Sequence, residues 1–128
     1  MRIEDPQALR QVAETCRCEC CNKHCPTGAA PHHLFSRGAG RLDIRLILQP
    51  LCLECHADFH NGKISRAFLL GKRAKKERTT AEAITQVVHW LRALPKDANE
   101  RQVRTSMHVW DFSAEGLKLA KRVWEEIG

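Results

Sequence analysis

The chain has 128 residues, a formal net charge of +6 and 43% hydrophobic residues, which is the size and composition of one globular domain. No apolar run is long enough to cross a bilayer, and the first residues, MRIEDPQALRQ, carry acids where a signal peptide carries basic residues. We therefore expect a cytoplasmic protein with no membrane association, in which clustered cysteines bind metal rather than form disulfides.

The first half of the chain predicts a short helix, an irregular cysteine-rich segment, a strand and a second helix. Asp5 and Pro6 are a typical N-cap and first helical residue. The segment CRCECCNKHCPTGAA is unsuited to long regular structure, and the GAG that follows it marks a loop. LILQPLC indicates an apolar strand, and LECHADFHNG indicates a helix stopped by Asn61 and Gly62.

The second half predicts mostly helices. Thr79 or Thr80, with Glu82 nearby, can cap a helix that runs to Leu94 with an apolar residue at each helical turn. Ser113 begins a last helix with one apolar face. Between them, VRTSMHVW is interpreted as a strand, although its alternation is weak.

The excess positive charge lies in one short segment. Residues 1–62 and 79–128 each carry seven basic and seven acidic residues, whereas residues 63–78, KISRAFLLGKRAKKER, carry seven basic residues and one acid. Such a run is either a solvated helix face or a surface that contacts phosphates. We divide the chain into two parts. Residues 1–62 form an N-terminal helix and a zinc-stapled core, and residues 63–128 form the basic segment and a helical extension packed on that core.

Four cysteines have the spacing of a structural zinc site. Cys18 and Cys21 form one C-x2-C pair, Cys52 and Cys55 form a second, and two such pairs complete a tetrahedral thiolate site. Four buried free thiols are the alternative, which two correctly spaced pairs disfavour. The first pair is less well defined because it has other potential ligands beside it. These are Cys16, Cys20, His24 and Cys25.

Four histidines suggest a second metal site. His56 and His60 are four residues apart, so a helix places both imidazoles on one face. A third ligand can come from His32 or His33, because neighbouring residues on a strand point to opposite sides. Three protein ligands leave open coordination positions, as in catalytic sites, and the uncoordinated histidine is a candidate general base. Taken singly, each histidine has the alternative role of a surface or capping residue.

Together these features resemble the zinc-containing HNH endonucleases, which have the ββα-metal fold, and especially their small phage-type members. The matching pieces are CECC, HHLFSRGAG, LQPLC and CLECHADFH, within residues 18–60, about a third of the chain. The resemblance implies an α+β fold, with a ββα-metal core and a structural zinc, flanked by additional, mostly C-terminal helices.

The resemblance also implies site residues and an activity. His33 matches the general base that activates water, and the reaction is hydrolysis of a DNA phosphodiester bond to a 3′ hydroxyl and a 5′ phosphate. We expect double-stranded DNA as the substrate, and Mg²⁺, Mn²⁺, Ni²⁺ or Zn²⁺ as the catalytic metal. The implied ligands are His32, His56 and His60 for the catalytic metal and Cys18, Cys21, Cys52 and Cys55 for structural Zn²⁺.

The basic segment and the SRGAGR loop supply the expected DNA contacts. Beside a phosphate-cleaving site, a basic segment favours backbone contacts, which carry no sequence specificity, over a merely solvated face. The predicted DNA-binding residues are Arg37, Arg41, Lys63, Arg66, Lys72, Arg73, Lys75, Lys76 and Arg78.

One position departs from the family pattern. The family asparagine before the L-x-P-L-C run aligns with Ile47, whose side chain cannot form hydrogen bonds to the loop or to the base. Asn61 and Gln49 are candidate substitutes. We therefore keep a second hypothesis, a non-catalytic zinc-stabilised DNA-binding module with an impaired HNH site, and a third, a zinc-stapled protein-interaction adaptor.

Overall fold

The computed structural model describes residues 1–127, and within them the chain is α+β, with six α-helices and one two-stranded antiparallel sheet. The α+β class predicted from the sequence is confirmed. Within the same residues, no helix combines the length and the apolar character that crossing a bilayer requires. The elements are α1 Pro6–Ala13, β1 Ala30–His33, the 3-10 turns Arg37–Ala39 and Arg45–Ile47, β2 Leu48–Leu51, α2 Leu53–His60, α3 Arg66–Lys76, α4 Ala81–Ala93, α5 Glu100–Val109 and α6 Ala114–Ile127.

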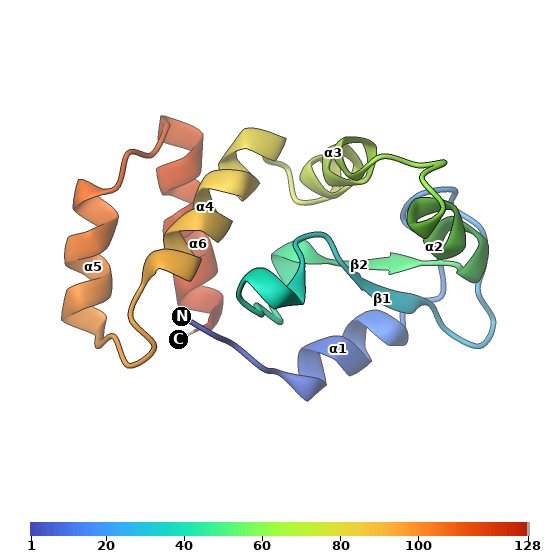
Figure 1. Cartoon of the computed structure of the whole chain (residues 1–128), viewed down its shortest axis with the longest axis horizontal. Coiled ribbons are helices and arrows are strands. Elements are labelled where there is room, and N and C mark those ends of the chain that lie inside the picture. The colour runs from blue at the N-terminus through green and yellow to red at the C-terminus, as the bar shows by residue number, and fades with distance from the viewer. Residues whose placement is uncertain (128) are drawn as a thin grey trace.

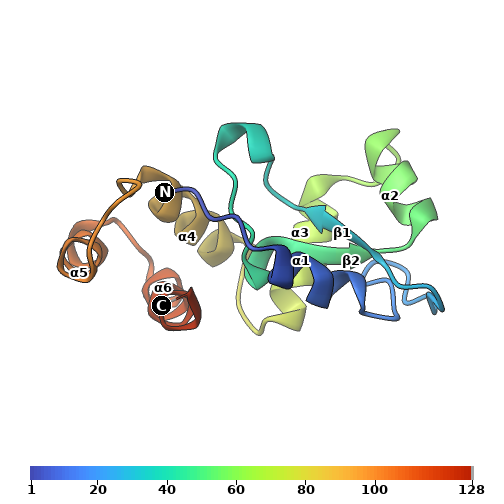
Figure 2. The ribbon, with the colours of Figure 1, turned by 90° about the horizontal axis from the view of Figure 1, so that it is seen from below.

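The two strands and the helix that follows them position the histidines. β1 and β2 pair antiparallel, with His32 opposite Gln49 and His33 opposite Leu48. Figure 1 shows α2 on one side of this hairpin and α1 on the other, and Figure 2 shows the hairpin from below. Because successive strand residues point to opposite faces, His32 and His33 meet different surroundings.

Side-chain caps fix where several helices begin, as the sequence predicted. Asp5 accepts hydrogen bonds from the N–H groups of Gln7 and Ala8, at 3.1 and 3.2 Å, and so begins α1. Thr80 begins α4 by accepting a hydrogen bond from the N–H of Ala83 at 3.1 Å. α2 stops directly before the Asn-Gly pair predicted to end it.

The strand prediction for residues 103–110 is wrong, because most of this segment belongs to the helix α5. Asn99 and Gln102 form a capping box at its start, with both hydrogen bonds at 2.9 Å. Val103 and Met107, four residues apart, are its buried residues. The narrow apolar stripe of a helix that packs on one side only was misread as weak strand alternation.

The two halves of the chain share one hydrophobic core. The buried cluster extends without a break from the cysteine pairs through the residues between β1 and β2 to α3, α4 and α6. Trp90 of α4 is fully buried, and its indole N–H donates to Ser106 Oγ at 3.1 Å. The N-terminal segment ties the halves together, since Ile3 bridges to Leu42 and the amino group of Met1 donates to a carbonyl at the end of α4.

Candidate functional site

Four cysteine sulfurs converge where the irregular segment before β1 meets the start of α2. The sulfurs of Cys18, Cys21, Cys52 and Cys55 all lie within 4.8 Å of one another, and those of Cys21 and Cys52 are 3.8 Å apart. A tetrahedral zinc site with Zn–S distances of about 2.3 Å has S···S edges of about 3.8 Å. The cluster is therefore compatible with a structural metal such as zinc, on the pairs that the spacing predicted.

Backbone N–H groups point at these sulfurs. The N–H groups of Cys20 and Cys21 lie 3.4 and 3.5 Å from Cys18 Sγ, and the N–H of Cys55 lies 3.4 Å from Cys52 Sγ. Burial raises the pKa of the Cys18 thiol, but hydrogen bonds from the N–H groups of Cys21, Cys52 and Cys20 outweigh it and lower the pKa to about 7. Burial and the neighbouring sulfurs raise the pKa of Cys55. Because a metal binds thiolates, its affinity for the cluster falls as pH falls.

Three imidazoles meet between β1 and α2. The Nε2 atoms of His56 and His60, one helical turn apart, are separated by 3.1 Å. The ring of His32 lies 5.4 Å from that of His56 and 6.3 Å from that of His60, centroid to centroid. Phe59 packs against the edge of His32 at 4.6 Å. The three histidines are therefore neighbours, but within residues 1–127 only the four cysteines form a group of three or more potential ligands close enough to hold one ion, so the histidine ligand set stays a prediction.

The Nε2 atom of His32 has no hydrogen-bond partner within residues 1–127, although the residue is only 5% exposed. Burial, followed by repulsion from His56 and His60, lowers the pKa of His32 to about 4. The imidazole is therefore neutral near pH 7, which is the form that binds a metal ion. A buried ring nitrogen without a partner is costly unless a ligand satisfies it.

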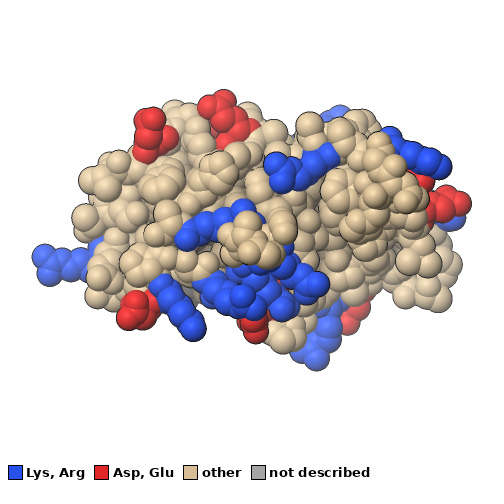
Figure 3. All heavy atoms as spheres, in the orientation of Figure 1, with Lys and Arg blue, Asp and Glu red and all other residues tan. Residues whose placement is uncertain are grey.

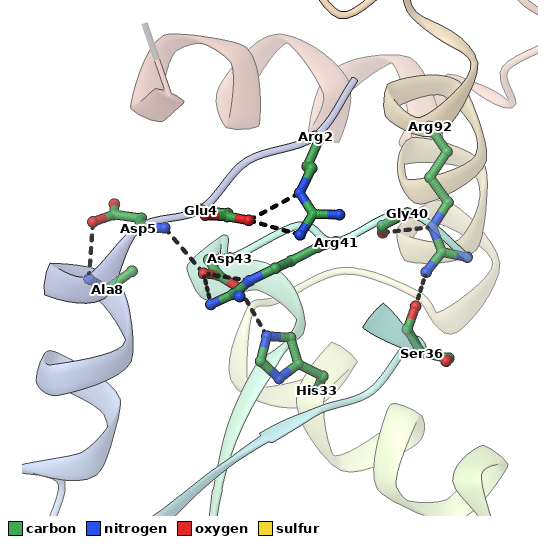
Figure 4. Close-up of polar contacts among 10 residues, drawn as sticks. All are labelled: Arg2, Glu4, Asp5, Ala8, His33, Ser36, Gly40, Arg41, Asp43 and Arg92. Atoms are coloured by element: carbon green, nitrogen blue, oxygen red, sulfur yellow. Dashed lines mark hydrogen bonds and ion pairs between the residues drawn. The ribbon is translucent and has the colours of Figure 1, made fainter. Parts of the chain in front are cut away.

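His33 lines the same hollow as these three histidines and bonds to a carboxylate that the sequence analysis did not identify. Its Nε2 lies 2.8 Å from Oδ1 of Asp43, whose side chain is completely buried. Asp43 also accepts hydrogen bonds from Arg41, at 3.0 and 3.1 Å from Nε, and from the N–H of Asp5 at 3.0 Å (Figure 4). When Nε2 of His33 donates to Asp43, Nδ1 is left as the acceptor.

The environment keeps Asp43 ionised. Burial would raise the pKa of this carboxyl, but hydrogen bonds from Arg41, His33 and the N–H of Asp5 outweigh burial and lower the pKa to about 2. A lone acid in the apolar run RLDIRLILQPL is the signal that could have identified it, because such an acid is rarely buried without a partner.

Neither the aligned Ile47 nor the candidate substitutes Gln49 and Asn61 forms a side-chain hydrogen bond with His33 in the described residues. Ile47 is 1% exposed and lies in the hydrophobic core. Gln49 is fully buried, and its amide donates to Glu19 at 2.7 Å and to the carbonyl of Leu69 at 2.9 Å. Asn61 is the exposed C-cap of α2. Asp43 is thus the side chain that orients His33 through a hydrogen bond.

A hollow opens over the histidines and has a positive rim. It is lined by all four histidines together with Leu34, Ser36, Arg37, Phe59 and Arg66. In the face drawn in Figure 3, Lys and Arg side chains gather near the middle, over the connection between β1 and β2. Exposed arginine beside a cluster of imidazoles favours an anionic ligand.

Arg92 is a second residue that sequence reasoning missed. Its guanidinium and that of Arg66 lie over the same ring, Phe35, at 5.8 and 5.2 Å from the centroid. Arg92 also donates to the carbonyls of Ser36 at 2.8 Å and Gly40 at 3.2 Å, so it fixes the loop beside His33. Burial and the nearby charge of Arg66 lower the pKa of Arg92. Both guanidiniums therefore add positive charge around Phe35, next to the loop that follows β1.

Two of the predicted DNA-contacting residues, Arg73 and Arg41, form ion pairs within the protein. Arg73 is 6% exposed and pairs with Glu19 at 2.6 Å and Glu77 at 3.4 Å, so its assignment to a DNA-contacting surface is corrected to a buried ion pair. Arg41 pairs with Asp43 at 2.8 Å but stays partly exposed, so its role as a phosphate clamp stays a prediction. The remaining predicted residues are exposed: Arg37, Lys63, Arg66, Lys72, Lys75, Lys76 and Arg78.

Comparisons of the chain with protein-family models, with curated protein sequences and with solved structures found no match.

Proposed function

We propose that the protein is a metal-dependent endonuclease of the HNH type, which hydrolyses phosphodiester bonds in double-stranded DNA. One observation carries the proposal. Three imidazoles converge on a hollow in which a fourth, His33, is held by a buried carboxylate, and Arg37 and Arg66 lie on the rim. A ligand set, a base and cations for a phosphate are the groups that hydrolysis of a phosphodiester requires.

His32, His56 and His60 are the residues that would hold the catalytic metal. The 3.1 Å between the Nε2 atoms of His56 and His60 is close to the edge of about 3.3 Å expected for nitrogens bound at about 2.0 Å to one tetrahedral ion. The unpartnered, buried Nε2 of His32, whose ring is 5.4 Å from that of His56, supports the third ligand. A bound Mg²⁺, Mn²⁺, Ni²⁺ or Zn²⁺ would offset the charge of the phosphate and stabilise the leaving oxygen.

Other residues of the chain would activate the water and bind the phosphate. His33 takes the proton of the attacking water on Nδ1, while its Nε2–H donates to Asp43. The ionised Asp43 fixes the ring and stabilises the imidazolium that forms, so it is a positioning residue rather than a catalytic one. Arg37 and Arg66 bind the phosphate in the hollow, and Arg92 holds the loop that carries Arg37.

Plasmid cleavage tests the proposal. The purified full chain is incubated with supercoiled plasmid and Mg²⁺, Mn²⁺, Ni²⁺ or Zn²⁺, beside a metal-free sample, His33→Ala, and His108→Ala as a matched control from the exposed surface of α5. We expect cleavage that requires metal, is lost in His33→Ala and is retained in His108→Ala. Absence of cleavage with every metal, from a chain that contains zinc and is folded, would refute the proposal.

The buried Ile47 favours a second candidate, a zinc-stabilised module that binds DNA without cutting it. The family asparagine is missing, and Ile47 is buried in the hydrophobic cluster, where its side chain offers no hydrogen bond to the base. DNA binding without cleavage in the same experiment would establish this candidate, whereas no binding at low salt would favour a protein-interaction adaptor.

A further inference from the structure

A second hollow lies between the cysteine-rich segment and α3, and we call it the α3 hollow. It is separate from the histidine hollow, since the two have no lining residue in common. Pro50 and Glu19 form part of its wall. The rest of the wall is strongly basic, with five cations: Arg17, Lys72, Lys75, Lys76 and Arg78.

The protein itself leaves these charges unpaired. Within residues 1–127, none of the five cations has a carboxylate at ion-pair distance. Glu19 is the one acid in the wall, and Arg73 binds its Oε1 at 2.6 Å while Gln49 binds its Oε2 at 2.7 Å. The carboxylate is therefore already used, and the five cations are free to bind an external anion.

The cations are held on rigid supports. Arg17 precedes a cysteine of the four-sulfur cluster and donates to the carbonyl of Asn22 at 3.1 Å. The three lysines lie on α3, and Nζ of Lys72 lies 5.4 Å from the ring centroid of Phe68. Several cations at fixed spacing suit the repeated phosphates of a nucleic acid better than one small anion.

α3 connects the two hollows. Arg66, its first residue, lines the histidine hollow, and Lys76, its last, lines the α3 hollow. The helix rises about 15 Å between them at 1.5 Å per residue. That length corresponds to about four base pairs of a duplex at 3.4 Å per step. A duplex that follows α3 would place one phosphate at the histidines and others at the lysines.

We infer that the α3 hollow binds the sugar–phosphate backbone of double-stranded DNA about four base pairs from the bond that is cut. The position relative to the cut rests on the proposed function, whereas the binding does not. Contacts of this kind add affinity without sequence specificity.

The test compares two variants that lose the same charge from different surfaces, both in a His33→Ala background so that no DNA is cut. The first replaces cations of the α3 hollow: Arg17→Gln, Lys72→Gln, Lys75→Gln and Lys76→Gln. The control replaces exposed cations of the helical half that form no ion pair within residues 1–127: Lys96→Gln, Arg101→Gln, Lys118→Gln and Lys121→Gln. Binding to a labelled duplex is followed by fluorescence anisotropy over a range of salt concentrations.

We expect the α3-hollow variant to lose at least about tenfold in affinity and to reduce the slope of log K against log salt by about three, while the control keeps both values near those of His33→Ala. Equal slopes and affinities in the two variants would overturn the inference. So would binding of a poly-glutamate peptide as tight as that of the duplex. If the wild-type protein cuts no plasmid but the α3-hollow variant still shows the smaller salt slope, the inference is supported and the proposed function is refuted. The two can therefore fail separately.

Discussion

Replacing Asp43 by Asn removes one buried negative charge and keeps the size of the side chain. The carboxylate binds His33, Arg41 and the N–H of Asp5, and its pKa is about 2 instead of 3.8. A shift of nearly two pH units corresponds to about 2 kcal/mol of interaction with the charged form. We therefore expect Asp43→Asn to lower the free energy of unfolding by about 2 kcal/mol at pH 7.

The effect on cleavage is expected to be larger than the effect on DNA binding. An amide cannot stabilise the imidazolium of His33, so the cleavage rate at saturating DNA should fall about 100-fold, while the Kd for DNA changes less than about threefold. Because Asp43 acts through His33, the variant His33→Ala/Asp43→Asn should be no slower than His33→Ala alone.

The assay is single-turnover plasmid cleavage, with urea unfolding and metal content measured on the same samples. Asp97→Asn, an exposed acid between α4 and α5, is the matched control and should leave rate and stability unchanged. A folded, metal-loaded Asp43→Asn variant that cleaves within about threefold of the wild type would refute the role of this residue.

Four further results are expected. The difference in the free energy of unfolding between wild type and Asp43→Asn should have its full size above the unfolded pKa of 3.8. It should vanish as pH falls from about 4 to about 2, because the folded pKa of Asp43 is lowered, and urea titrations at several pH values measure it. Cys55→Ser should abolish zinc binding, measured by elemental analysis, and lower the Tm by more than about 10 °C, because the metal contributes folding energy. Ile47→Asn should lower the free energy of unfolding by about 3 kcal/mol without raising cleavage, since it places an unpaired amide in the core; faster cleavage would contradict the packing. Arg73→Gln should destabilise by about 3 kcal/mol because Glu19 loses its buried partner, and it should leave the salt dependence of DNA binding unchanged.

Features that depend on a few neighbouring residues were determined by the sequence itself. The Asp5 and Thr80 caps act on N–H groups two or three residues away, so their helices begin where the sequence predicts. The C-x2-C spacing likewise restricts which cysteines can share an ion, and the four predicted sulfurs do converge. Helix α5 was missed because hydrophobic alternation was given more weight than its capping box at Asn99.

The partners of buried charges were decided only by the tertiary structure. Asp43 is ten residues from His33 and reaches it across the connection between the strands, while Arg73 is 54 residues from Glu19. The same basic run contains Arg73, which is buried, and Lys72 and Lys76, which line an open hollow. The sequence determines the sign of the charge on each side chain. Which partner that charge has depends on the elements that pack against it, because a buried charge is stable only when it is paired.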